Sequence, residues 1–236
     1  SKRWWGAMVL RPLPRRLEPN SLGAMKVRLL ALIAAPLLAG GCATSTATRP
    51  AAAPPVFEKG MVSAADPRAA EAGAEILRQG GSATDAALAT LLALTVVEPQ
   101  SSGIGGGGFL IVDDGKGKVD ALDGRETAPA AAGPDWFKLN GQYLTIPQAI
   151  PGGKSVGVPG NVALMAEAHR RHGKLAWKAL FAPAIRLAGE GFTVTPRLSA
   201  FLDRFRETGA LSAEGRSIYY PDGNPVAAGT TLKNPA

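Results

Sequence analysis

Arg125 is the residue whose setting in this sequence most suggests binding chemistry. It lies in the segment Asp-Gly-Arg-Glu-Thr-Ala-Pro (123–129), directly after a glycine and between Asp123 and Glu126. A guanidinium held in such a loop can bind the carboxylate of a small molecule through two parallel hydrogen bonds. An arginine flanked by acids is also often a partly exposed member of an ion pair, which contributes little to stability. The residues alone leave both interpretations open.

The two histidines, His169 and His172, are the next candidates for chemistry. They stand three residues apart near the end of a predicted helix, in Glu-Ala-His-Arg-Arg-His-Gly-Lys, so their side chains share a face. The flanking arginines would repel a metal cation, and basic residues are favourable near a helix C-terminus. We therefore expect a solvated polar face rather than a metal site or a catalytic triad. We also expect no matched acid–base pair among the carboxylates of the predicted hairpin, Asp113, Asp114, Asp120 and Asp123.

The glycine-rich stretch SSGIGGGGFLIV matches the spacing G-x-G-x-x-G at Gly103, Gly105 and Gly108. This spacing binds the pyrophosphate of a dinucleotide when a strand leads into the glycines and a helix leaves them. Here the order is reversed, because residues 82–97 are predicted to be a helix and residues 109–122 a hairpin. We therefore predict no bound nucleotide. The glycines are interpreted as positions of positive φ or of close approach between backbones.

The net charge of +7 is concentrated near the start of the sequence. Residues 1–41 contain seven lysines and arginines and one glutamate, which leaves 19 basic and 18 acidic residues for the remainder. A nearly neutral body does not support a surface that follows a phosphate backbone. We predict no nucleic-acid partner.

Met25 begins a segment typical of a bacterial export signal. Two basic residues precede an apolar run over 29–38, and small residues lead to Cys42. The apolar run is too short to cross a bilayer as a stable helix. Cys42 is the only cysteine and follows Leu-Ala-Gly-Gly, so it resembles the lipid-modified cysteine of bacterial lipoproteins, although Leu38 lies four residues before it instead of the usual three. A plain secretory signal is the alternative.

These patterns divide the chain into four parts. Residues 1–24 precede a complete signal and are interpreted as an upstream extension of the gene model, and residues 25–41 are the signal peptide. Residues 42–56 hold the lipid-anchor cysteine and a flexible linker rich in Ala, Thr and Pro. Residues 57–236 form the folded domain. We expect an exported bacterial protein that is periplasmic or anchored to the outer membrane.

Start and stop signals indicate the helices of the folded part. Asp66-Pro67 begins one helix and Gly80-Gly81 ends it, while Ser82 with Asp85 forms a capping-box pattern that opens an apolar helix. Helices are also predicted after Pro159-Gly160, within residues 176–191 and after Thr195-Pro196. Helices, a hairpin and more helices in this order predict an α/β fold in which helices cover a sheet.

Five segments together are similar to the front part of gamma-glutamyltransferase, also called gamma-glutamyltranspeptidase or glutathione hydrolase. The segments are GMVSAADPRAAEAGAEILRQGGSATDAALA, GIGGGGFLIV, DGRETAP, GVPGNVALMAEAHRRHGKLAW and APAIRLAGEGF, and they follow one another in the family's order from about Gly60 onward. The resemblance implies an N-terminal nucleophile hydrolase fold, a four-layer αββα sandwich that would be incomplete in this chain. It also implies that the glycine-rich stretch binds no nucleotide.

The resemblance implies a precursor that cleaves itself into a large and a small subunit. The threonine exposed at the start of the small subunit attacks the gamma-glutamyl amide of glutathione or a related compound, with its own α-amine as base. The acyl-enzyme then passes the glutamyl group to water, an amino acid or a peptide. Arg125 matches the family arginine that holds the α-carboxylate of that group.

The nucleophile and the oxyanion donors of the family have no counterpart in the matching segments. The resemblance therefore implies that this chain is a fragment with no catalytic residue, no metal and no cofactor, that it is inactive alone, and that its partner is the missing C-terminal small subunit. An acylase of the same family, acting on cephalosporin side chains, is the alternative enzyme. A catalytically silent envelope lipoprotein with this scaffold is the alternative outside enzymes.

Overall fold

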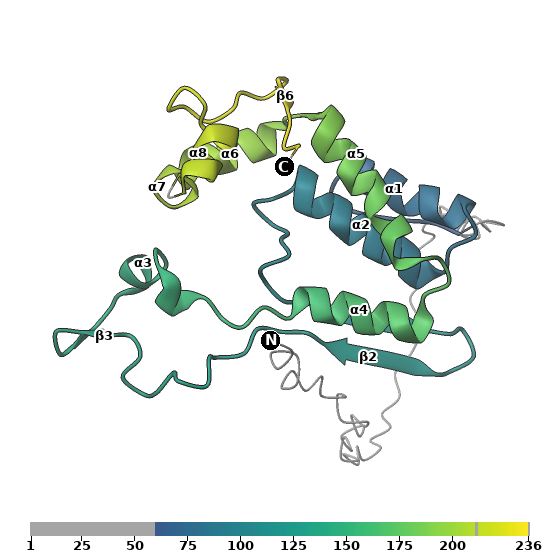
Figure 1. Ribbon diagram of the computed structural model, residues 1–236, viewed down its shortest axis with the longest axis horizontal. Coiled ribbons are helices and arrows are strands. Elements are labelled where there is room, and N and C mark those ends of the chain that lie inside the picture. The colour runs from purple at the N-terminus through teal and green to yellow at the C-terminus, as the bar shows by residue number, and fades with distance from the viewer. Residues whose placement is uncertain (1–59, 211, 236) are drawn as a thin grey trace, which may run out of the picture. The chain divides into compact units, whose positions relative to one another are not determined.

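The computed structural model describes residues 60–210 and 212–235, and Figure 1 shows how their helices and strands are arranged. The predicted signal peptide, Cys42 and the linker lie outside the described residues. Within the described part, no helix combines the length and the apolar character that a membrane span requires.

The first two helices form where their cap residues predict them. Helix α1 (Pro67–Arg78) begins after Asp66, whose Oδ1 accepts a hydrogen bond from the backbone N–H of Arg68 at 2.9 Å. It ends before Gly80, which has a φ of +84° that glycine adopts without strain. Helix α2 (Ala83–Val97) begins with the predicted capping box, in which Ser82 and Asp85 each bond the other's backbone N–H.

Asp85 is a buried carboxylate that ties the start of α2 to a distant loop. Its Oδ2 accepts hydrogen bonds from the backbone N–H groups of Ser82, Lys174 and Leu175 at 2.9, 2.9 and 3.1 Å. Burial raises the pKa of this carboxyl, but the three backbone donors outweigh burial and leave the pKa below its ordinary value. Asp85 therefore stays ionised and holds the loop after α4 in place.

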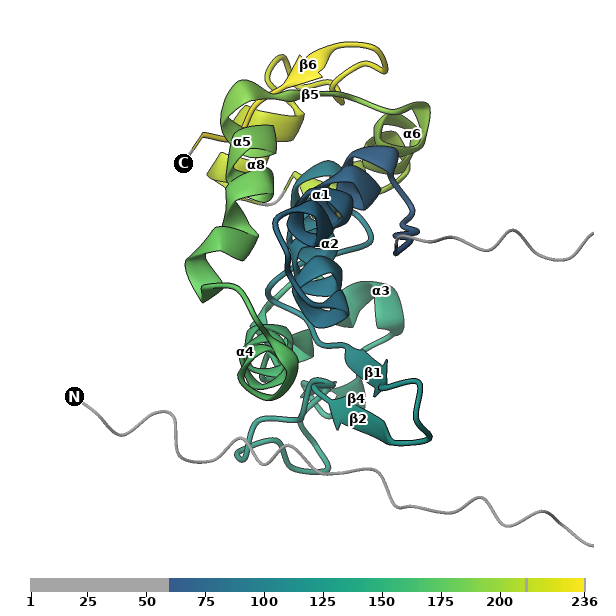
Figure 2. The same ribbon diagram turned by 90° about the vertical axis from the view of Figure 1, so that its right-hand side faces the viewer.

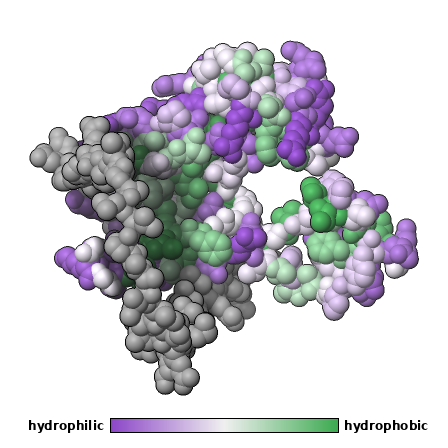
Figure 3. Space-filling view, turned by 180° about the vertical axis from the view of Figure 1, so that it is seen from behind, coloured by the Kyte–Doolittle hydropathy of each residue, from purple (hydrophilic) through white to green (hydrophobic). Residues whose placement is uncertain are grey.

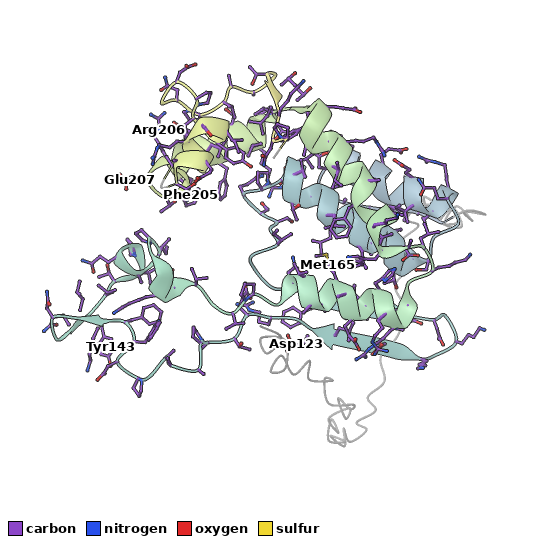
Figure 4. The ribbon with its side chains drawn as sticks, viewed as in Figure 1. Asp123, Tyr143, Met165, Phe205, Arg206 and Glu207 are labelled. Atoms are coloured by element: carbon purple, nitrogen blue, oxygen red, sulfur yellow. The ribbon has the colours of Figure 1, made fainter. Side chains whose placement is uncertain are left out.

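One hydrophobic cluster lies where α1 and α2 meet α4 (Asn161–His172), the 3-10 helix Trp177–Phe181 and α5 (Ala182–Glu190) (Figure 2). Met165 points from α4 toward α2 (Figure 4). Burial of these apolar side chains supplies the main stabilisation of this part of the fold. The buried members are Ile76, Ala86, Leu88, Ala89, Leu92, Leu122, Leu164, Met165, Ala168, Leu180 and Ala184.

The predicted hairpin is formed by β1 (Phe109–Asp113) and β2 (Val119–Asp123), which pair antiparallel with Leu110 opposite Leu122. These two leucines belong to the cluster under α4, which covers this face of the hairpin. The other face exposes Phe109, Ile111 and Val119, each more than half exposed. The prediction of a sheet covered by helices is thus confirmed on one face of this two-stranded ribbon.

A second cluster forms around the C-terminal elements. These are β5 (Phe192–Thr193), α6 (Pro196–Arg204), α7 (Arg206–Gly209), α8 (Ala213–Tyr219) and β6 (Thr231–Leu232), which pairs with β5. The predicted Thr195 cap of α6 is confirmed, since Thr195 Oγ1 accepts from the N–H of Leu198 at 3.1 Å. Tyr220 donates its hydroxyl to the carbonyl of Leu202 at 2.9 Å. The buried members are Ala69, Ala72, Ala93, Val97, Phe192, Val194, Leu198, Leu202, Tyr220 and Leu232.

The segment from 125 to 159 has a different character, because none of its residues is buried. It contains a short hairpin, β3 (Lys138–Leu139) with β4 (Gln142–Tyr143), then α3 (Ile146–Ala149) and a 3-10 turn, Gly153–Ser155. Apolar side chains remain on its surface, as the green patches on this segment show (Figure 3). Tyr143, which is 62% exposed, is one of them (Figure 4).

Candidate functional site

Three glycines from distant parts of the sequence, Gly107, Gly124 and Gly160, meet next to Arg125. A Cβ added to Gly107 would lie 2.6 Å from the carbonyl oxygen of Gly124, and one added to Gly160 would lie 2.0 Å from the same oxygen. At Gly124 an added Cβ would lie 2.5 Å from the Cβ of Leu164. Only glycine permits such close approach of backbones. The glycine-rich loop, the arginine loop and the start of α4 are therefore packed into one junction, which we call the glycine junction.

Hydrogen bonds fix this junction. The N–H groups of Gly160 and Asn161, at the start of α4, both donate to the carbonyl of Gly106 at 3.0 Å. The side-chain amide of the buried Asn161 donates to the carbonyl of Gly103 at 2.7 Å. The carbonyl of Gly106 therefore accepts from two amides at this helix N-terminus. Such amides are the groups that would hold a phosphate in a nucleotide site.

The glycine-rich stretch does not use left-handed backbone. The described glycines with positive φ include none of the five between 103 and 108. Of the two interpretations made from the sequence, close approach is confirmed at Gly107 and positive φ is wrong for this stretch.

Arg125 lies two residues after Asp123, the last residue of β2, which is labelled in Figure 4 at the end of that strand. Asp123 Oδ1 accepts a hydrogen bond from the N–H of Arg125 at 2.9 Å, so the backbone of the loop is anchored. Nε of Arg125 lies 3.2 Å from Oε2 of Glu126, and the arginine side chain is 70% exposed. The flanking acids thus orient the arginine, while its terminal nitrogens donate no hydrogen bond to any residue of the described part.

Two open cavities flank the Arg125 loop. The first, of about 470 Å³, lies over the glycine-rich loop and is lined by residues of α2, β1 and α4. The second, of about 520 Å³, is lined by Arg125, Trp136, Lys154 and the chain around them. Glu126 lines both cavities. Both volumes fall in the range of small-molecule sites.

The expectation of a solvated polar face is wrong for both histidines. Nε2 of His169 lies 2.8 Å from the carbonyl of Leu175, and its ring packs against Trp177 with centroids 5.3 Å apart. Nε2 of His172 lies 2.7 Å from Oδ2 of Asp120. Each ring is about a quarter exposed and contacts its own partner.

Asp120 is the centre of a charged group that the sequence analysis missed. Its carboxylate accepts from His172 and, at 3.2 Å, from Arg171, and these partners hold the pKa of Asp120 below its ordinary value. Arg171 also pairs with Glu167 at 2.7 Å, and hydrogen bonds from Arg170 and Arg171 lower the pKa of Glu167 to about 2. The alternation of the hairpin, which puts Asp120 on the face toward α4 with Leu122, was the signal for this contact.

No group of three or more metal-binding side chains is found within residues 60–210 and 212–235. The arrangement instead offers an exposed guanidinium, held on an anchored loop between two cavities. A guanidinium in this setting can bind an anion such as a carboxylate.

A family model described as gamma-glutamyltranspeptidase matches residues 69–236. The glutathione hydrolase proenzyme of Bacillus subtilis strain 168 is 41% identical over 179 residues, which are 75% of this chain and 30% of that protein. The gamma-glutamyltranspeptidase structure from Helicobacter pylori aligns with a TM-score of 0.70 at 32% identity, over 75% of this chain and 51% of that chain.

A cephalosporin acylase structure from Bacillus halodurans aligns with a TM-score of 0.67 at 37% identity, over 75% of this chain and 34% of that chain. The fold is thus the α/β fold of N-terminal nucleophile hydrolases, present here in part. The chain spans about a third or less of the length of the curated relatives that it matches first, 27% and 30%.

Proposed function

This chain belongs to the gamma-glutamyltranspeptidase family, and from that membership we propose that it forms the first part of the large subunit of a precursor that hydrolyses and transfers gamma-glutamyl groups. Glutathione is the representative substrate. The similarity to a glutathione hydrolase proenzyme over three quarters of this chain supports the family activity. The small share of that protein that is covered, 30%, supports the fragment status.

The proposed reaction has two steps. A threonine of the small subunit attacks the gamma-carbonyl carbon of the substrate, and its α-amine takes the hydroxyl proton and returns it to the leaving amine. Water or the amine of an amino acid or peptide then attacks the acyl-enzyme, which releases glutamate or a new gamma-glutamyl compound. This chain contributes binding and orientation to these steps, and we expect it to have no activity without the small subunit.

The placement of Arg125 is the observation that carries the proposal. The gamma-glutamyl group bears an α-carboxylate, and the exposed guanidinium of Arg125 is suited to bind it by a paired hydrogen bond. The glycine junction and the Asp123 contact hold the backbone of this loop, so the arginine is presented from a rigid base. Rigid positioning of a substrate group lowers the entropic cost of reaching the transition state.

The proposal is tested by expressing the full-length precursor and assaying it with glutathione. We expect self-cleavage into two subunits, seen as two bands on a denaturing gel, and release of glutamate. The 236-residue chain expressed alone should release no glutamate. A processed precursor that leaves glutathione intact would contradict the proposed activity.

An acylase of the same family is a second candidate, and the acylase structure at 37% identity is the observation that favours it. The two enzymes are distinguished by their substrates. An acylase should release the side chain of a cephalosporin faster than it hydrolyses glutathione, whereas we expect the reverse order.

A silent envelope lipoprotein with this scaffold is the candidate outside enzymes. It is distinguished by the coding sequence downstream of this segment. A segment similar to Thr-Thr-His at the expected cleavage point would support the enzyme, and its absence from an intact reading frame would support the binding protein.

We further propose that the protein is exported and anchored by a lipid on Cys42, to the periplasmic side of a bacterial membrane. The signal that begins at Met25 and the single cysteine support this proposal. Labelled fatty acid should enter the protein in a bacterial host, and Cys42→Ser should abolish labelling and release the protein from membranes. Membrane retention without any label would contradict the lipid anchor.

A further inference from the structure

We propose that Lys154 binds the C-terminal carboxylate of a gamma-glutamyl peptide. This contact would make the site selective for such peptides over gamma-glutamyl amides that have no carboxylate at that end. The inference rests on the proposed function, because it assumes that Arg125 holds the α-carboxylate. Lys154 would be a residue that determines specificity, and it would take no part in bond breaking.

The cavity of about 520 Å³ brings two basic residues into one lining. Arg125 and Lys154 both line it, although they lie 29 positions apart in the sequence. A bridge between Thr127 and Val158 joins the two walls, with the N–H of Val158 donating to the carbonyl of Thr127 at 2.8 Å. Gly157 permits the contact, since a Cβ there would lie 2.8 Å from the Cβ of Glu126.

The backbone at Lys154 is held by its neighbours. Lys154 lies in the 3-10 turn Gly153–Ser155, and its carbonyl accepts a hydrogen bond from the indole Nε1 of Trp136 at 2.7 Å. The ammonium donates to the carbonyl of Lys138 at 3.3 Å. An ammonium has three donors, so this contact leaves capacity for a carboxylate.

The side chains that line the cavity carry a net positive charge. Its lining contains one carboxylate, Glu126, which pairs with Arg125. Lys154 forms no ion pair with any carboxylate in the described part of the chain, whereas the neighbouring Lys138 is paired with Asp135 at 2.7 Å. Besides Arg125, Lys154 is therefore the second cation in this lining that can pair with a ligand carboxylate.

The chemistry of a gamma-glutamyl peptide fits this arrangement. Such a peptide has a carboxylate on the glutamyl residue and another at its C-terminus, and a tripeptide spans roughly 10 Å when extended. The stretch between the carboxylates is uncharged. Trp136 and Phe137 supply an apolar wall of the cavity for that stretch.

The test compares glutathione with its C-terminal amide, in which the far carboxylate is neutral, using the full-length precursor after self-cleavage. Lys154→Met should lower kcat/KM for glutathione by roughly 1.5-fold to fivefold, the range of an exposed ion pair, mainly through KM. The same variant should leave kcat/KM for the amide unchanged. Lys154→Arg should restore most of the loss, and Lys116→Met, in the hairpin turn, is the matched charge control.

The outcomes separate this inference from the proposed function. If the wild type hydrolyses both substrates and Lys154→Met leaves the ratio of their kcat/KM values unchanged, the Lys154 assignment is overturned while the proposed function stands. If the wild type hydrolyses neither, the proposed function fails and takes this inference with it. A preference for glutathione that weakens at high salt would support the Lys154 contact further, because salt screens exposed charges.

Discussion

The two regions on either side of Arg125, the glycine junction and the segment 125–159, differ in how they are held together. On one side, the glycine junction packs the backbones of Gly107 and Gly160 against Gly124, and Gly124 against the buried side chain of Leu164. On the other side, the segment 125–159 has no buried residue and depends on short turns and the bridge from Thr127 to Val158. The glycine junction is fixed by close packing that tolerates little change in shape. The segment 125–159 is held mainly by contacts within itself, so its residues can change without disturbing the core. It is therefore suited to setting substrate specificity.

The largest effect is expected at the glycine junction. Gly160→Ala puts a Cβ 2.0 Å from the carbonyl oxygen of Gly124, and backbone on both sides must shift. We expect the free energy of unfolding to fall by about 3 kcal/mol or more, at the upper end of overpacking costs. Chemical denaturation of the full-length protein measures this loss.

Gly133→Ala is the matched control for that substitution, because a Cβ there meets no atom within 4 Å. It should change the free energy of unfolding by no more than about 0.5 kcal/mol. Equal losses of unfolding free energy in the two variants would contradict the distinction between the closely packed glycine junction and the segment 125–159.

A somewhat smaller loss is expected when the buried carboxylate is neutralised. Asp85→Asn replaces an ionised acceptor of three backbone hydrogen bonds, so we expect about 2 kcal/mol of lost stability, in the range of hydrogen bonds to charged groups. Thermal or chemical denaturation at neutral pH measures it. Asp222→Asn, at an exposed position, should have almost no effect.

The same carboxylate makes a prediction about pH. Because folding lowers the pKa of Asp85, its stabilisation is complete above the unfolded pKa of about 4 and is lost as the pH falls through the lower folded pKa. The loss of stability below pH 4 should therefore be shallower in Asp85→Asn than in the wild type. Parallel acid limbs in the two proteins would show that the contacts of Asp85 contribute nothing.

The smallest effect is expected on the exposed segment. Ile146 is 76% exposed, so Ile146→Ala should change the free energy of unfolding by no more than about 0.5 kcal/mol. Leu164→Ala, at a position 2% exposed, should cost about 2 to 5 kcal/mol. Denaturation of the full-length precursor measures both. A large loss for Ile146→Ala would mean that another part of that protein covers this segment.

Local signals predicted the packed region well. The caps at Asp66, Ser82 and Thr195 form as expected, because each depends on residues within one turn of the helix. The hairpin was predicted for the same reason. The turn Asn140-Gly141, with φ values of 51° and 80°, is also a strong hairpin signal, and it joins β3 to β4.

Contacts between distant segments could not be predicted in the same way. Asp120 and His172 lie 52 residues apart, and the three glycines of the junction come from three separate segments. These contacts arise from tertiary packing, and a local sequence pattern does not predict which distant segments come into contact. The loop position of Arg125 was predictable from its neighbours, while the cavity that it shares with Lys154 was visible only in the structure.

Recognition of the substrate α-carboxylate by Arg125 is the central claim, and it is tested most directly by two substrates that differ only in that group. The measurement is kcat/KM of wild type, Arg125→Lys and Arg125→Ala precursors with a gamma-glutamyl anilide and with the γ-aminobutyryl anilide, which lacks the carboxylate. Subunit formation should persist in all three proteins and serves as the folding control, because self-cleavage needs no free glutamate carboxylate.

Loss of a paired guanidinium–carboxylate contact should cost about 2 to 4 kcal/mol. We therefore predict that Arg125→Ala lowers kcat/KM for the gamma-glutamyl anilide by roughly 30-fold to 800-fold and leaves the γ-aminobutyryl anilide nearly unaffected. Arg125→Lys should be impaired as well, because it keeps the charge and loses the paired geometry. An equal effect of Arg125→Ala on both substrates, or no effect on either, would contradict the claim and leave Arg125 as a surface ion pair with Glu126.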